Sequence, residues 1–290
     1  MNKIILGTAA LNSSYGWNKS NNFNDFKSLL VFSRFLGIDT IDTAPSYFYG
    51  LKNANIFHNF KFKIISKIPT IRNLTKDVIK LFLNKQLLIN YNLFKTKKIY
   101  CLLFHDADDF YSDKIKLVLN ELILLKKNGI IKKIGVSVYH PQQIFQILNV
   151  FHPLVPDIVQ LPINILDNRF KNNDMLKLLK DKKIEIHARS IFLQGILLNN
   201  FYKLPAYFFK WKEIFLLWEK IKLKAYPETI CFNYVYNIPE IDKIIIGFRN
   251  LNEINSFYVH SRLKKHVQIP KKLTSFSDIN LLNPQNWLIK

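Results

Sequence analysis

The 290-residue sequence is poor in the features that mark metal-binding, disulfide-bonded and membrane proteins. It has only two cysteines, Cys101 and Cys231, and neither has a metal-type or redox-type spacing, so both are interpreted as ordinary buried thiols. No apolar run reaches the roughly 18 to 20 uncharged residues of a membrane-spanning helix. Met1 leads directly into a predicted strand without a signal-peptide pattern. These absences predict a cytoplasmic protein with no membrane segment and no metal site.

Acidic residues are also scarce, because 21 Asp and Glu stand against 42 Lys and Arg, a formal net charge of +21. A charge of this size makes nucleic acids and anionic membranes partners to consider. The lysines, however, are spread along the chain in pairs such as Lys126-Lys127 and Lys271-Lys272, and no nucleic-acid recognition motif accompanies them. A chain rich in Lys, Asn, Ile and Phe, as this one is, is also typical of an AT-rich genome. We expect no nucleic-acid partner; binding that weakens steeply with salt would indicate one.

The chain alternates short apolar runs with longer amphipathic ones, a pattern typical of repeated strand-helix units around a parallel sheet. The eight expected strands are Lys3–Thr8, Ile38–Asp42, Lys63–Lys67, Ile99–His105, Lys133–Ser137, Asp157–Gln160, Ile184–Arg189 and Lys243–Ile246. The expected helices are Asn24–Leu36, Leu51–Phe60, Thr75–Tyr91, Asp113–Lys127, Pro141–Val150, Asp174–Lys180, Phe208–Lys224, Pro227–Tyr236 and Asn250–Leu263. Eight units predict an α/β fold, a single-domain (β/α)8 TIM barrel over residues 1–290, with residues 270–290 as an extension that packs on the barrel.

Three successive predicted strands end in residues with ionisable side chains, namely Asp42, Lys67 and His105. A barrel gathers the C-terminal ends of its strands on one face, so neighbouring strands would bring these three side chains together. Each residue also has an ordinary explanation. The Asp can cap the next helix, the Lys can be a solvated strand end, and the His can cap a loop.

The turn after Asp42 carries two tyrosines that bear on the same site. Tyr47 follows the acid by five residues, whereas Tyr49 directly precedes Gly50. Asp, Tyr, Lys and His in this order resemble the aldo-keto reductase family, whose catalytic tetrad has this composition. The resemblance covers most of the chain and includes residues 4–8, 129–137, 157–160 and 246–247.

Two further segments, residues 166–170 and 186–195, are similar to a bacterial branch of this family often found beside surface-polysaccharide and nonulosonic-acid genes. The resemblance implies an NADP-dependent oxidoreductase that reduces a sugar-like aldehyde or ketone. The chemistry needs a proton donor, because hydride transfer to a carbonyl leaves an alkoxide. Tyr47 is the expected general acid, with Lys67 lowering its pKa, Asp42 holding the lysine, and His105 orienting the carbonyl. Tyr49 is the alternative, because the family's Gly usually follows its tyrosine directly.

The resemblance also implies a cofactor site. Its expected residues are Thr8, Ser137, Gln160, Arg189, Ser190, Phe192, Gly247 and Arg249. Arg249 follows a glycine turn at a predicted helix start and is the expected partner of a 2′-phosphate, which implies NADPH with NADH as the alternative. The other interpretation of Arg249 is a solvated residue at a helix start.

Four residues depart from the family pattern. Val138 replaces an Asn, Arg189 replaces the Tyr that stacks on nicotinamide, and Ser256-Phe257 replace a Glu-Asn pair that helps to hold adenine. The cation at Arg189 predicts a negatively charged substrate. The same departures favour an alternative function, a catalytically weak or inactive barrel that serves as a binding or regulatory module. The sequence does not predict the substrate or the oligomeric state.

Overall fold

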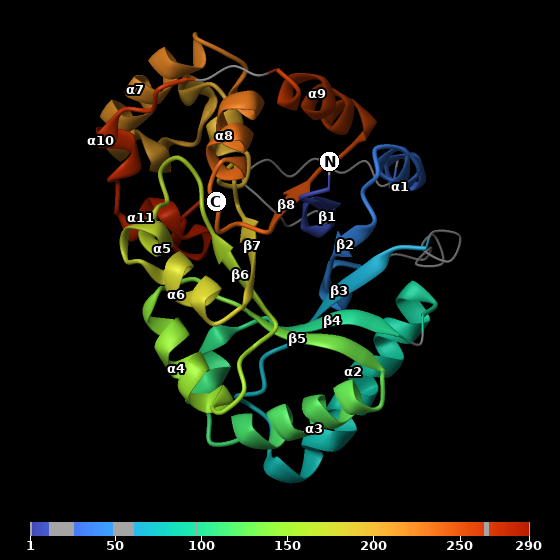
Figure 1. The fold of residues 1–290 in the computed structure, drawn as a ribbon. Coiled ribbons are helices and arrows are strands. Elements are labelled where there is room, and N and C mark those ends of the chain that lie inside the picture. Colours follow the sequence, from blue (N-terminus) through green and yellow to red (C-terminus); the bar gives the residue numbers. More distant parts are fainter. Residues whose placement is uncertain (1, 12–25, 49–60, 97, 264–266, 290) are drawn as a thin grey trace.

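The computed structural model describes residues 2–11, 26–48, 61–96, 98–263 and 267–289. Eight parallel strands form a closed barrel in which each strand pairs with the next along the chain and the last pairs with the first (Figure 1). They are β1 (Ile4–Gly7), β2 (Thr40–Asp42), β3 (Lys63–Ile68), β4 (Ile99–Phe104), β5 (Ile131–Ser137), β6 (Ile158–Pro162), β7 (Glu185–Arg189) and β8 (Lys243–Gly247). The predicted (β/α)8 barrel is confirmed, and each strand overlaps its predicted range.

The helices surround the barrel on its outer side (Figure 1). They are α1 (Phe26–Phe35), α2 (Ile79–Phe94), α3 (Ile115–Lys127), α4 (Gln142–Phe151), α5 (Arg169–Asn172), α6 (Met175–Asp181), α7 (Lys212–Lys222), α8 (Pro227–Tyr236), α9 (Leu251–Ser261), α10 (Lys271–Thr274) and α11 (Ile279–Leu282). The short helices α5, α10 and α11 were not predicted, and the helix expected at 51–60 lies outside the described residues. Within the described part of the chain, none of the helices combines the length and apolarity needed to span a membrane.

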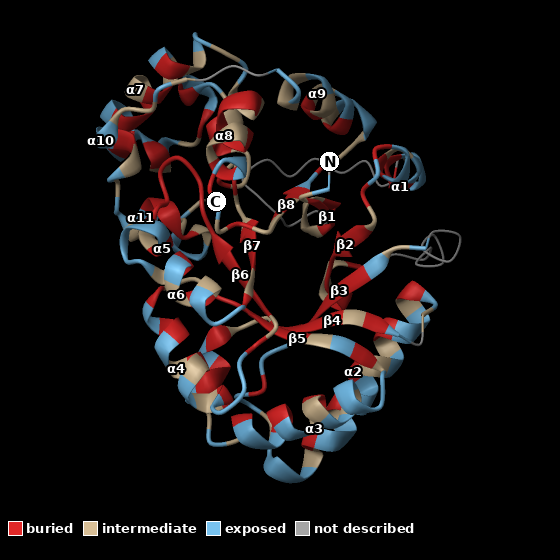
Figure 2. Ribbon diagram, in the orientation of Figure 1, coloured by how far each residue is buried: buried red, intermediate tan, exposed pale blue. Residues whose placement is uncertain are grey.

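The strands are buried on both faces because helices cover them outside and side chains fill the barrel inside. Figure 2 shows this contrast between the buried strands and the exposed outer sides of α2 and α3. Close strand packing explains Gly135 in β5, where an added Cβ would lie 2.5 Å from the carbonyl oxygen of Ile158. Gly129 ends α3 with a φ of +69°, a conformation that favours glycine.

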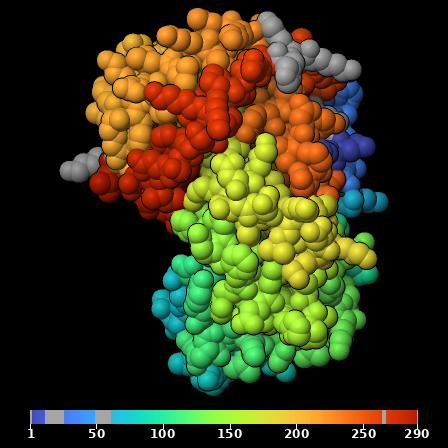
Figure 3. Space-filling model, turned by 60° about the vertical axis from the view of Figure 1, so that its left-hand side comes forward, coloured from blue at the N-terminus to red at the C-terminus, as the bar shows by residue number. Residues whose placement is uncertain are grey.

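A second apolar cluster forms from the long segment after β7 and the C-terminal tail. The rings of Phe208 and Trp287 pack with their centroids 5.1 Å apart. Trp211 Nε1 donates to Asp278 Oδ2 over 2.8 Å, and Tyr207 Oη donates to the Asn280 carbonyl over 3.0 Å. Figure 3 shows the tail lying along this segment on the outer surface. These contacts bring the tail close to the face where the strands end.

Candidate active site

The four residues predicted as a catalytic group lie together at the C-terminal ends of β2, β3 and β4. Lys67 Nζ donates to Asp42 Oδ1 over 2.5 Å, and both side chains are almost fully buried. The same nitrogen lies 5.5 Å from the centre of the Tyr47 ring. The rings of Tyr47 and His105 meet edge to face at 6.3 Å. A phenol, an ammonium, a carboxylate and an imidazole are therefore assembled at one point.

The short 3-10 helix η3 (Pro45–Phe48) positions Tyr47 directly after β2. Pro45 restricts the backbone at the start of this turn. Phe48 is buried and packs against Phe26 and Phe94, at ring distances of 6.3 and 6.1 Å, which anchors the end of the turn in the core. The half-buried Tyr47 is thereby held over Lys67. Tyr49, the alternative proton donor, lies outside the described residues.

The surroundings of these side chains set their protonation states. Burial is the largest single influence on the pKa of Lys67 and lowers it, but Asp42 and Tyr47 together outweigh burial, so the pKa is raised and the ammonium is retained. Burial raises the pKa of Tyr47, and the charge of Lys67 offsets this only in part. The Lys67 charge acts in the direction expected from the sequence, but burial has the larger effect on this pKa. Tyr47 therefore holds its proton.

Burial, followed by the Lys67 charge, lowers the pKa of His105 to about 4, so its imidazole is neutral at pH 7.

Asp42 is fixed by contacts from β3, from β6 and from Thr8, which directly follows β1. Gln160 Nε2 donates to Asp42 Oδ2 over 2.6 Å, so both carboxylate oxygens are engaged. The Thr8 hydroxyl lies 2.7 Å from that of Thr43 and 3.3 Å from the Asp42 carbonyl, and Thr8 itself does not line the cavity described below. Thr8 thus supports the ends of β1 and β2. Gln160 Oε1 is buried and has no hydrogen-bond partner within the described part of the chain.

A cavity of about 560 Å³ opens above this group, within the usual range for small-molecule and cofactor sites. Besides the four residues, it is lined by most of the predicted cofactor residues: Ser137, Gln160, Arg189, Ser190, Phe192, Gly247 and Arg249. Pro284 of the C-terminal tail also lines it. The unpartnered Gln160 oxygen is an acceptor for an amide N–H, so the cavity fits the carboxamide end of a nicotinamide cofactor.

The loop after β7 forms one wall of the cavity and has an unusual backbone. Ser190, Leu193 and Gln194 have φ values of 60°, 47° and 51°, in the left-handed region that few non-glycine residues adopt. Gly195 follows at 88°. Such strain persists only where surrounding structure holds it, and it is concentrated at functional sites. In the sequence, only the glycine signals this turn.

Arg189 is held in place by three contacts at the end of β7. Its Nη2 donates to the Val138 carbonyl over 2.8 Å, and Nη1 lies 3.3 Å from Ser190 Oγ. Its guanidinium lies 4.1 Å from the centre of the Tyr139 ring. Sequence reasoning missed Tyr139, because nothing in the local pattern distinguishes it from a loop residue. The stacking gives Arg189 a fixed orientation with its charge on the cavity wall.

Arg249, the predicted phosphate ligand, is paired with an acid of the same chain. Its Nε and Nη2 lie 2.7 and 2.6 Å from Glu253 Oε1, and its backbone N–H donates to Glu253 Oε2 over 2.8 Å. Sequence reasoning missed Glu253, although its i+4 spacing from Arg249 is a signal for such a pair. Close by, the buried Phe257 packs on Phe192 at 6.3 Å, so this end of the cavity is also aromatic.

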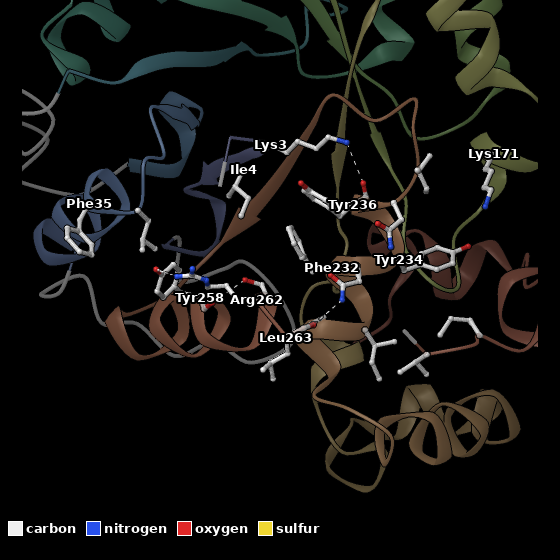
Figure 4. Close-up of a pocket in the computed structure, with 18 residues that line it drawn as sticks. Lys3, Ile4, Phe35, Lys171, Phe232, Tyr234, Tyr236, Tyr258, Arg262 and Leu263 are labelled. Atoms are coloured by element: carbon white, nitrogen blue, oxygen red, sulfur yellow. Dashed lines mark hydrogen bonds between the residues drawn. The ribbon is translucent and has the colours of Figure 1, made fainter. Parts of the chain in front are cut away.

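A larger cavity of about 1110 Å³ lies elsewhere, toward the N-terminal ends of β1 and β8 (Figure 4). Lys3 and Arg262 lie over the rings of Tyr236 and Tyr258, at 5.0 and 5.1 Å. None of the four predicted catalytic residues lines it. Its size alone therefore does not identify the reaction site.

The model of the aldo/keto reductase family matches residues 3–265 of this sequence. The chain belongs to the aldo/keto reductase family. Membership implies an oxidoreductase that acts on small-molecule carbonyl compounds with a nicotinamide cofactor. No curated protein sequence matches the chain.

Solved structures support the fold. The holo form of aldo-keto reductase AKR11C1 from Bacillus halodurans superposes with a TM-score of 0.72 at 15% identity, covering 95% of this chain and 94% of that one. The thermostable aldo-keto reductase Tm1743, in complex with the inhibitor epalrestat, gives 0.68 at 19% identity, covering 96% of each chain. None of these comparisons supports the narrower bacterial branch suggested by residues 166–170 and 186–195.

Proposed function

We propose that this protein reduces the carbonyl group of a small, sugar-like aldehyde or ketone with NAD(P)H, and that Tyr47 donates the proton. The observation that carries the proposal is the buried Lys67–Asp42 pair beneath Tyr47 and His105, at the floor of a cavity of cofactor size. A protonated phenol beside a fixed ammonium is suited to protonate an oxygen on which negative charge develops.

The four side chains have distinct roles in this proposal. Tyr47 delivers its hydroxyl proton to the carbonyl oxygen. Lys67 stabilises the phenolate that results, and Asp42 keeps the ammonium charged and in place. The neutral imidazole of His105 offers an N–H that orients the substrate oxygen. When bound, the nicotinamide cofactor supplies the hydride.

The cofactor would be held by side chains from four strands and the loops that follow them. Gln160 Oε1 and Ser137 are available to a carboxamide, and Arg189, Ser190 and Phe192 line the adjoining wall. Gly247 and Arg249 lie at the far end, where Arg249 would contact a 2′-phosphate and favour NADPH over NADH.

Arg189 supports a substrate that carries a negative charge. Among the described residues that line the cavity, Lys67 is paired with Asp42 and Arg249 with Glu253, whereas the contacts of Arg189 are a carbonyl, a hydroxyl and a ring. Its charge is therefore not neutralised by an acid, and an anionic group on the substrate would supply the missing partner.

Turnover of a panel of acidic and neutral sugar aldehydes and ketones, followed by the absorbance of the reduced nicotinamide, tests the proposal. We expect reduction, with acidic compounds turned over faster than matched neutral ones. Arg189→Tyr should abolish that difference. Equal rates for acidic and neutral compounds in both proteins would refute the anionic substrate, and no reduction of any carbonyl would refute the enzyme assignment.

A second function is favoured by one observation. Glu253 already pairs with Arg249, so a contact expected to bind cofactor is engaged within the chain. A barrel that keeps the catalytic residues but binds cofactor weakly would act as a binding or regulatory module. Weak cofactor binding without carbonyl reduction would support this alternative.

A further inference from the structure

The ion pair between Arg249 and Glu253 joins two kinds of side chain that favour different cofactors, one with a 2′-phosphate (NADPH) and one without it (NADH). A guanidinium pairs with a 2′-phosphate, whereas a carboxylate accepts a hydrogen bond from a free ribose 2′-hydroxyl. In this protein the two groups contact each other through two guanidinium nitrogens and one carboxylate oxygen. Both also line the cavity above Tyr47.

The Glu253 carboxylate contacts the Nε and Nη2 side of the guanidinium, where a 2′-phosphate would also find its donors. Its Oε1 accepts from the guanidinium, and its Oε2 accepts from the backbone N–H of Arg249. A 2′-phosphate on this arginine must therefore displace a carboxylate or lie beside it, and either arrangement opposes binding. A ribose hydroxyl meets no such repulsion.

The surrounding charges do not relieve this repulsion. Glu228 also lines the cavity, and its carboxylate lies 3.8 Å from His260 Nδ1. Two other cations line the described part of the cavity wall, both near the predicted catalytic residues. Lys67 pairs with Asp42, and Arg189 stacks on the ring of Tyr139. The side chains of Arg249 and Glu253 are 37% and 32% exposed, so a ligand can reach both.

Resting on the proposed NAD(P)H-dependent function, we propose that Glu253 determines the cofactor preference of this enzyme by competing with the 2′-phosphate for Arg249. Arg249 favours NADPH, Glu253 opposes it, and the protein discriminates only weakly between NADPH and NADH. Glu253 is a specificity-determining residue, and its removal converts weak discrimination into a clear preference for NADPH.

The test compares dissociation constants of NADPH and NADH for the wild type and Glu253→Gln, measured by fluorescence titration. The glutamine keeps an oxygen that can accept from the Arg249 backbone but has no charge. We expect about tenfold tighter NADPH binding, because one close like charge is removed, with NADH changed less than about twofold. Glu213→Gln is the matched control, because this acid is 86% exposed on α7 and should change neither constant.

Glu253→Ala removes the same charge without adding an amide and should shift the NADPH to NADH ratio in the same direction. The proposal is overturned if both cofactors respond equally to Glu253→Gln and Glu253→Ala, or if neither responds while the wild type binds them saturably. Either of these two outcomes overturns this inference but leaves the proposed function standing. If neither the wild type nor the variants bind NADPH or NADH, the proposed function fails and this inference fails with it.

Discussion

The two sides of the cavity differ in how their charges are arranged. On the side of β2, β3 and β4, the Lys67–Asp42 pair is buried and supported by Gln160, and it lies directly beneath Tyr47. On the side of β7 and β8, the cations are two arginines. Arg189 contacts a backbone carbonyl and an aromatic ring, and Arg249 pairs with Glu253. In the proposed function, the first side carries out the proton transfer and the second side binds the cofactor and the substrate.

This difference predicts that mutations on the first side abolish turnover and mutations on the second side change selectivity. The largest effect should follow Tyr47→Phe, which removes the proposed proton donor and should lower turnover by about a hundredfold to ten-thousandfold with cofactor binding nearly intact. Steady-state kinetics beside a cofactor titration would measure both quantities. Tyr49→Phe is the matched control and should cost little. A large loss with Tyr49→Phe instead would place the donor two residues further along the turn.

Removal of the buried charge should destabilise the fold as well as the site. Lys67→Met leaves the buried Asp42 carboxylate without its partner and should lower the free energy of unfolding by about 3 to 5 kcal/mol in urea titrations. Lys63→Met, on the same strand, breaks an exposed pair with Asp39 and should cost less than about 1 kcal/mol. Similar losses in the free energy of unfolding for the two variants would show that the buried Lys67–Asp42 pair contributes no more to stability than the exposed pair.

His105 should make the stability of the fold depend on pH. Its pKa is lowered from 6.5 to about 4, so as pH falls below 6.5 the unfolded chain takes up a proton that the folded protein does not. This contribution to stability is present above pH 6.5 and is lost as pH falls toward 4, by about 3 kcal/mol. His140 also has a lowered pKa, so the measurement is the difference between wild type and His105→Gln in unfolding titrations across this range. Identical slopes for the two proteins would mean that His105 titrates normally.

The smallest effect should arise at the β8 side, where Arg249→Ala should weaken NADPH binding by about tenfold to hundredfold. A charge-assisted hydrogen bond of about 1.5 to 3 kcal/mol accounts for this range. NADH binding, measured in the same titration, should stay nearly unchanged. Equal losses for both cofactors would show that Arg249 supports the turn and does not recognise a phosphate.

The same contrast explains how much could be predicted from the sequence. All eight strands are evident because each is a short apolar run, and barrel topology then places Asp42, Lys67 and His105 on one face. The contacts of Arg189 could not be predicted in this way, because they depend on the left-handed backbone at Ser190 and on the stacking of Tyr139, neither of which has a sequence period. The Arg249–Glu253 pair has a local signal, its i+4 spacing, but that spacing does not show that the pair lies at the cavity.

The net shift in the pKa of Tyr47 could not be predicted from the sequence for a related reason. Sequence spacing predicts which groups meet, but the pKa of a phenol also depends on how far it is removed from water, and that follows from packing. The anchoring of Phe48 in the core helps to bury Tyr47, and burial raises the pKa of its hydroxyl more than the lysine lowers it.

The most direct test of the account is titration of the wild-type protein with NADPH and with NADH, following the quenching of tryptophan fluorescence. A cavity that holds an unpartnered Gln160 oxygen above the Lys67–Asp42 pair should bind both cofactors saturably, with a modest preference for NADPH. If neither cofactor binds at millimolar concentrations, the site has no source of hydride and the account of this cavity as a reductase active site is contradicted.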